Sequence, residues 1–211
     1  MKLKIPNILT IGRIIIVPIF VFTFYLPGLL GDLIPFFIFL LASFTDFLDG
    51  LLARLYKQES KLGELLDPIA DKIIVATALV LLVMNDTINN YEVIAAIIIL
   101  IREILISGLR EFLAKSQVAM PVTSLAKFKT FIQMLAIAIL LTGDSGNKLV
   151  NFQDYNAHTI GIVLLWLSAF LTLYTGYDYV KKGMTMPLTK IRNVKLLFFF
   201  LLKLDSFLTS F

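Results

Sequence analysis

Charged residues interrupt strongly apolar segments between Asp46 and Asp71. If Leu33 to Tyr56 forms one helix, five positions spaced by three or four residues share one of its faces. These positions are Asp46, Asp49, Gly50, Ala53 and Arg54. The next helix places three residues on one face at intervals of four, namely Gly63, Asp67 and Asp71. Because the polar link 57–62 is short, antiparallel helices would turn the two faces toward each other.

Carboxylates that converge in weakly polar surroundings repel one another, and a divalent cation relieves this repulsion. The chain has no cysteine and one histidine, which is distant in sequence, so oxygen-only ligands favour Mg²⁺ or Mn²⁺ over zinc. Gly50 and Ala53 are the smallest residues on their face, so a ligand can approach the backbone there. The guanidinium of Arg54 suits a phosphate. This combination indicates phosphoryl or phosphatidyl transfer.

The spacing D-x2-D-G-x2-A-R-x8-G-x3-D-x3-D, read from Asp46 to Asp71, resembles the complete signature of the CDP-alcohol phosphotransferase family. Further stretches resemble the phosphatidylglycerophosphate synthase branch of that family. They are Ile5–Thr10 with Arg13, Arg102–Phe112, and Lys127–Thr130 followed by Gln133 and Met134. Ala126 departs from the pattern, because many members carry glycine before the first lysine.

The resemblance implies transfer of the phosphatidyl group from CDP-diacylglycerol to sn-glycerol 3-phosphate, with release of CMP. It implies one or two Mg²⁺ or Mn²⁺ ions, held by Asp46, Asp49, Asp67 and Asp71. Asp71 would also be the base that takes the proton of the acceptor hydroxyl. The implied CDP-binding residues are Asp49, Gly50, Ala53, Arg54 and Gly63, of which Gly50 and Ala53 would border the cytidine. A homodimer is implied as well.

A dianionic acceptor needs cations, and four basic residues lie close to the ends of the fourth and fifth apolar segments. The candidates for the acceptor phosphate are Arg102, Arg110, Lys127 and Lys129. Each could instead anchor the chain at a membrane surface. Glu103 is expected to pair with an arginine or to orient the acceptor. Arg13 could reach the headgroups or face the acidic site.

The composition predicts an all-α integral membrane protein. Of 211 residues, 58% are hydrophobic, the mean hydropathy is +0.88, and apolar runs repeatedly reach the roughly 20 residues that cross a bilayer. Six spans are expected in one bundle: Asn7–Tyr25 with Asn7 as helix cap, Leu33–Tyr56, Leu65–Met84 with Asp67 as a possible N-cap before Pro68, Val93–Phe112, Ser124–Leu141 and Thr159–Val180. If the third helix starts earlier instead, Pro68 would kink it. Residues 1–185 would form this domain, and 186–211 a basic and apolar tail that lies at the interface as a helix.

Six spans put both termini on one side of the membrane. The loops after the first, third and fifth spans contain only Lys148 among the 19 lysines and arginines, so the opposite face is predicted to be cytoplasmic. The acidic motif then faces the cytoplasm from the cell (inner) membrane. The net charge of +4 reflects this interfacial distribution, and nucleic acid is not an expected partner.

Three other interpretations compete with this one. A sister enzyme could use phosphatidylglycerol, serine or inositol phosphate as its acceptor. A divalent-cation transporter could also place aspartates in membrane helices, and the acids could simply pair with Lys57, Lys61 and Lys72 at the membrane surface. His158 is expected to be solvated in a loop on the far side, and Trp166 to pack or anchor at the interface.

Overall fold

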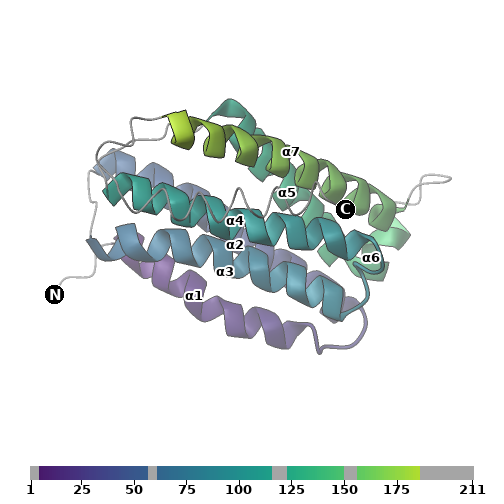
Figure 1. Ribbon diagram of the computed structural model, residues 1–211. Coiled ribbons are helices and arrows are strands. Elements are labelled where there is room, and N and C mark those ends of the chain that lie inside the picture. Colours follow the sequence, from purple (N-terminus) through teal and green to yellow (C-terminus); the bar gives the residue numbers. More distant parts are fainter. Residues whose placement is uncertain (1–4, 57–60, 116–122, 150–155, 186–211) are drawn as a thin grey trace. The chain divides into compact units, whose positions relative to one another are not determined.

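The computed structural model describes residues 5–56, 61–115, 123–149 and 156–185. Within these ranges the regular structure is entirely helical (Figure 1). The helices are α1 (Ile5–Thr23), α2 (Leu29–Tyr56), α3 (Lys61–Met84), α4 (Glu92–Lys115), α5 (Ser124–Leu141), α6 (Gly143–Leu149) and α7 (Ala157–Thr185). For some helical residues, among them Asp46, Asp49 and Asp67, only the backbone is described. The predicted interfacial helix of the tail lies outside the described residues.

Each of the six predicted spans corresponds to a long helix, and the bounds of α5 are those predicted. One predicted helix start is wrong. Asn7 lies inside α1, because Pro6 fits the first turn of a helix and the helix therefore begins upstream. For the third span two starts were possible, and the structure has the earlier one: α3 begins at Lys61, so Asp67 lies inside the helix and is not its N-cap.

Two short features differ from the predicted loops. Gly28 adopts a φ of +62°, which glycine accepts without strain, and α2 begins directly after it rather than at Leu33. The polar segment Gly143–Leu149 forms the short helix α6, although a loop was predicted there.

The long helices pack through small and branched apolar residues. Helix α1 lies along α2 and α3, α2 also contacts α5 and α6, and α3 contacts α4 and α5 (Figure 1). Phe20 of α1 and Phe39 of α2 are fully or almost fully buried in the same cluster as residues of α3 to α5 and α7. Ala78, Ala95 and Ala136 contribute small side chains to this cluster, so neighbouring backbones can approach closely.

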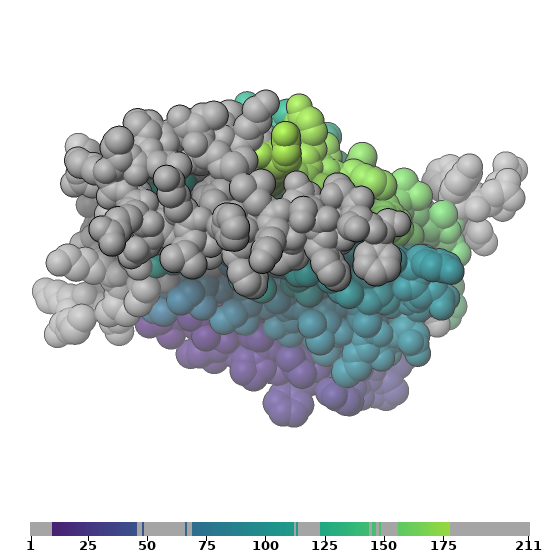
Figure 2. Space-filling view, viewed as in Figure 1, coloured from purple at the N-terminus to yellow at the C-terminus, as the bar shows by residue number. Residues whose placement is uncertain are grey.

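Many large apolar side chains point outward instead. Phe22 is 73% exposed and Phe170 is 63% exposed, and the same holds for isoleucines and leucines on every long helix of the described part. Figure 2 shows part of the outer surface, where α1 (purple) lies beside α3 (blue). Extensive apolar exposure in a chain of this hydropathy fits contact with lipid rather than water.

Within the part of the chain that the structure describes, two stretches are long and apolar enough to cross a membrane, Ser124–Leu141 and Ala157–Tyr177. Thr10–Thr23 and Leu29–Thr45 are shorter apolar helical stretches. These features support a membrane protein. The six-span bundle, the orientation of the termini and the cytoplasmic site remain predictions.

Polar contacts connect the chain at the end of α2 that is remote from the acidic motif. Asp32 accepts hydrogen bonds from the backbone N–H and the hydroxyl of Ser145, at 3.0 Å and 2.7 Å. A cavity of about 540 Å³ lies beside this contact. His158 is the second residue of α7 rather than a loop residue, and its Nε2 lies 2.8 Å from the carbonyl oxygen of Thr87. These contacts link the start of α2 to α6, and the start of α7 to the loop between α3 and α4.

The chain divides into two compact units, residues 1–174 and 175–211, and the border falls within α7. The first unit contains the acidic motif and all contacts described below. The predicted domain border at residue 185 remains a prediction.

Candidate functional site

The acidic motif occupies the adjoining ends of α2 and α3, which contact each other. Asp46 and Asp49 lie in the second half of α2, and Asp67 and Asp71 lie in the first half of α3. The helical backbone therefore gives both sets the spacing that was predicted to place them on one face. The side chains of the first three aspartates lie outside the described residues, as do those of the nucleotide-site candidates Ala53 and Arg54 and the surroundings of Gly50 and Gly63. Their convergence remains a prediction.

The fourth aspartate has a defined partner. Arg13 of α1 donates from Nη1 to Oδ1 of Asp71 across a distance of 2.6 Å. The arginine side chain is only 4% exposed, whereas the aspartate side chain is 43% exposed. A buried guanidinium needs such an anion, and the pair joins α1 to α3 at the depth of the motif. Of the two alternatives for Arg13, the structure confirms that it faces the acidic site.

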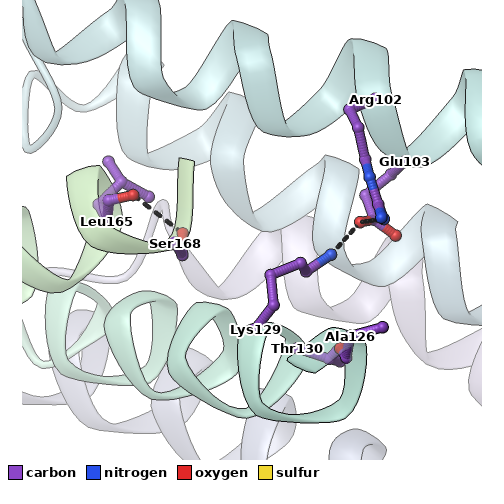
Figure 3. Close-up of polar contacts among 7 residues, drawn as sticks. All are labelled: Arg102, Glu103, Ala126, Lys129, Thr130, Leu165 and Ser168. Carbon is purple, nitrogen blue, oxygen red and sulfur yellow. Dashed lines mark hydrogen bonds and ion pairs between the residues drawn. The ribbon is translucent and has the colours of Figure 1, made fainter. Parts of the chain in front are cut away.

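A second charged cluster lies between α4 and α5 (Figure 3). Glu103 accepts from Nη1 of the adjacent Arg102 at 3.1 Å and forms a short ion pair with Nζ of Lys129. Lys129 is almost fully buried, and the side chain of Arg102 is 12% exposed. The predicted pairing of Glu103 with an arginine is confirmed. Its bond to Lys129 across 26 positions of sequence is an additional link that connects two helices.

The two charged groups are electrostatically connected through α3. Lys72, which follows Asp71, interacts with Glu103, Arg110 and Glu111 of α4. Acidic and basic side chains thus alternate from α1 through α3 and α4 to α5. The acidic motif lies at one end of the helices of the first unit. The start of α3, the end of α4 and the start of α5 lie at this same end.

The four basic candidates for an acceptor phosphate fall into two pairs. Arg110 and Lys127 are exposed, whereas Arg102 and Lys129 lie inside and contact Glu103. An exposed cation can meet an incoming anion directly, while a buried one must be held by its partners until the anion arrives. The arrangement provides cations at two depths beside the acidic motif.

The donor set of the motif is chemically suited to a hard divalent ion, because aspartate supplies only oxygen. Among the described side chains, no group of three or more histidines, cysteines, aspartates or glutamates could hold a metal. That search includes Asp71 but not the side chains of Asp46, Asp49 and Asp67. The metal site therefore remains a prediction from residue type and helical register.

Gln133 was noted in the sequence only as part of a motif, and the structure gives it a distinct environment. Its side chain is 2% exposed, and Oε1 has no hydrogen-bond partner within the described part of the chain. Sequence alone does not reveal this, because burial of one face of α5 depends on how the neighbouring helices pack.

Comparisons with known proteins agree with the motif. A family model described as CDP-alcohol phosphatidyltransferase matches residues 3–174. Three curated relatives carry the name CDP-diacylglycerol–glycerol-3-phosphate 3-phosphatidyltransferase. The protein of Rickettsia bellii is 43% identical over 178 residues, covering 84% of this chain and 94% of its own. That of Haemophilus influenzae is 41% identical over 185 residues, covering 86% and 94%. That of Cereibacter sphaeroides is 38% identical over 214 residues, covering 87% and 97%.

Proposed function

The chain belongs to the CDP-alcohol phosphatidyltransferase family, and from this premise we propose that it transfers the phosphatidyl group of CDP-diacylglycerol to sn-glycerol 3-phosphate, giving phosphatidylglycerophosphate and CMP. The observation that carries the proposal is the similarity, at 38–43% identity over most of the chain, to relatives named for that activity. The complete acidic signature and the basic residues beside it support the same chemistry.

Four aspartates would hold the metal, Asp46, Asp49, Asp67 and Asp71. Bound Mg²⁺ or Mn²⁺, as one or two ions, would neutralise charge on the pyrophosphate and so make CMP a better leaving group. Asp71 would accept the proton of the attacking hydroxyl, and its partial exposure suits contact with a substrate. The buried Arg13 would fix the carboxylate in position.

The donor substrate would lie against α2. Gly50 and Ala53 would leave room beside the helix backbone for the cytidine, and Arg54 and Gly63 would lie near the nucleotide phosphates. Asp49 would contribute to both the metal and the nucleotide sites. The diacylglycerol chains would remain in the bilayer, which fits the apolar outer surface of the long helices.

The acceptor would lie toward α4 and α5, where its phosphate meets cations. Exposed Arg110 and Lys127 would attract the dianion, and buried Arg102 and Lys129 would bind it once it has entered. A serine acceptor carries no phosphate and gives no reason for these cations. Among sister reactions, an inositol phosphate or a phosphatidylglycerol acceptor is therefore the stronger alternative.

The enzyme would be a multi-pass protein of the cell (inner) membrane, with the site facing the cytoplasm, where glycerol 3-phosphate enters and CMP leaves. The distribution of lysine and arginine supports this orientation. A homodimer is part of the proposal by family resemblance. Cation transport is disfavoured, because relatives that match most of the chain are named as phosphatidyltransferases.

The deciding experiment incubates the purified full-length protein with CDP-diacylglycerol, Mg²⁺ and one acceptor at a time. Products are followed by mass, and CMP release is measured in parallel. We expect phosphatidylglycerophosphate with sn-glycerol 3-phosphate and no comparable product with serine, inositol phosphate or phosphatidylglycerol. Product with serine but none with glycerol 3-phosphate would overturn the choice of acceptor. Absence of CMP release with every acceptor would overturn the proposed reaction.

A further inference from the structure

Gln133 presents an unusual group inside the helix bundle. Its side chain is 2% exposed, and its Oε1 is buried without a hydrogen-bond partner among the described residues. A buried amide oxygen without a donor is costly, and more so in apolar surroundings. Such an atom is expected to meet a donor at some stage of the protein's activity.

The position of Gln133 relates it to the charged cluster described above. It follows Lys129 by one helical turn, so the two side chains are neighbours on the buried face of α5. Glu103 holds the ammonium group of Lys129 from α4 (Figure 3). A molecule whose anionic end reaches Lys129 would bring its next few atoms toward Gln133.

An amide oxygen accepts hydrogen bonds and cannot donate them. It therefore cannot bind a phosphate dianion, which has no proton to offer, but it can bind a hydroxyl. Glycerol 3-phosphate carries two hydroxyls, a primary one that attacks and a secondary one on C2 that does not react. The separation between its phosphate and its hydroxyls is of the same order as one helical turn.

We propose that Oε1 of Gln133 accepts a hydrogen bond from the C2 hydroxyl of the acceptor while Lys129 binds its phosphate, so that Gln133 determines specificity for a 2-hydroxylated acceptor. This inference rests on the proposed function. It extends that function to a residue that contacts the acceptor away from the reacting hydroxyl. Hydrogen-bonding sites of this kind discriminate strongly, because an analogue without the hydroxyl leaves the site's polar group unpaired.

The test compares sn-glycerol 3-phosphate with 3-hydroxypropyl phosphate, which keeps the phosphate and the attacking primary hydroxyl but lacks the C2 hydroxyl. For the wild-type protein we expect kcat/KM to be at least about tenfold higher with glycerol 3-phosphate. Equal use of both acceptors by the wild type would overturn the inference, whatever any variant does. No product with either acceptor would instead show that the proposed function is wrong, and the inference would fall with it.

The variant Gln133→Met keeps the length of the side chain and removes the amide. We expect it to lose at least about tenfold in kcat/KM for glycerol 3-phosphate, to retain its rate with 3-hydroxypropyl phosphate, and to keep the KM for CDP-diacylglycerol. Its melting temperature should be unchanged or higher, because a buried unpaired group has been removed. An equal loss with both acceptors, or a changed KM for CDP-diacylglycerol alone, would contradict the role. The neighbouring Met134→Leu is the matched control and should preserve the discrimination.

Discussion

Arg13 and Asp71 form an ion pair at 2.6 Å, although 58 positions separate them in the sequence. The arginine is buried and the aspartate is half-exposed. The buried guanidinium therefore holds a carboxylate that a ligand can still reach. Since α1 contributes no aspartate to the motif, this pair is its defined contribution to the site. Helix α1 thus orients a carboxylate that belongs to α3.

The variant Arg13→Met should impair catalysis without removing any metal ligand. Residues that orient a ligand typically change activity or metal affinity by roughly 10–100-fold when they are replaced, and we expect kcat to fall within that range. CMP release at saturating substrates measures it. Arg13→Lys, which keeps a cation but loses the planar fork, should lose less. A fully active Arg13→Met enzyme would mean that the ion pair serves only packing.

Asp71→Asn should abolish turnover while preserving much of the binding of CMP. The amide cannot accept the proton of the acceptor hydroxyl, and loss of a general base typically costs about 10²- to 10⁴-fold in rate. Binding of CMP can be followed by calorimetry in the presence of Mg²⁺. Normal turnover of this variant would refute the assignment of Asp71 as the base.

Removal of divalent cations should stop the reaction reversibly. If the four aspartates converge as proposed, they would repel one another without a cation and the pyrophosphate would stay unneutralised, so EDTA should abolish CMP release. Added Mg²⁺ or Mn²⁺ in excess of the chelator should restore it. Activity that is indifferent to EDTA would disprove the metal site.

The long helices could be predicted because an apolar run of fixed length is a strong local signal. The bounds of α5 agree at both ends, where Thr123 caps the N-terminus and Gly143, with a φ of +52°, follows the C-terminus. The start of α3 could not be predicted, because an aspartate before a proline fits both the N-cap of a helix and a position inside its first turns.

The contacts of the site depend on packing between helices, which the sequence does not specify. Arg13 had two possible environments, and the choice depends on how α1 is rotated against α3. The bond from Lys129 to Glu103 depends on the register between α4 and α5. The acidic signature itself needed no such information, since helical periodicity alone places its members on common faces.

Asp32 provides a contrast with the aspartates of the motif, because its contacts are structural. It accepts two hydrogen bonds from Ser145 at the other end of α2. Asp32→Ala should therefore lower the free energy of unfolding by roughly 1–3 kcal/mol, seen as a lower melting temperature in detergent. The kcat and KM values of the protein that remains folded should be unchanged. A large loss of kcat without a loss of stability would indicate that this end of the molecule takes part in the reaction.

The pair of Glu103 and Lys129 allows structure and function to be separated. Lys129→Met leaves Glu103 with Arg102 as a remaining partner and should cost roughly 1–3 kcal/mol of stability, whereas Glu103→Leu removes the carboxylate from both cations and should cost about 3 kcal/mol or more. In the double variant the buried ammonium that Glu103→Leu alone leaves behind is gone, so the melting temperature should be higher than that of Glu103→Leu, although Arg102 has still lost its bond to Glu103. Its KM for glycerol 3-phosphate should nevertheless stay high, because the ammonium proposed to bind the phosphate is absent. If the double variant recovers both stability and KM, the pair only connects α4 to α5; if the losses in stability simply add, the two residues do not interact.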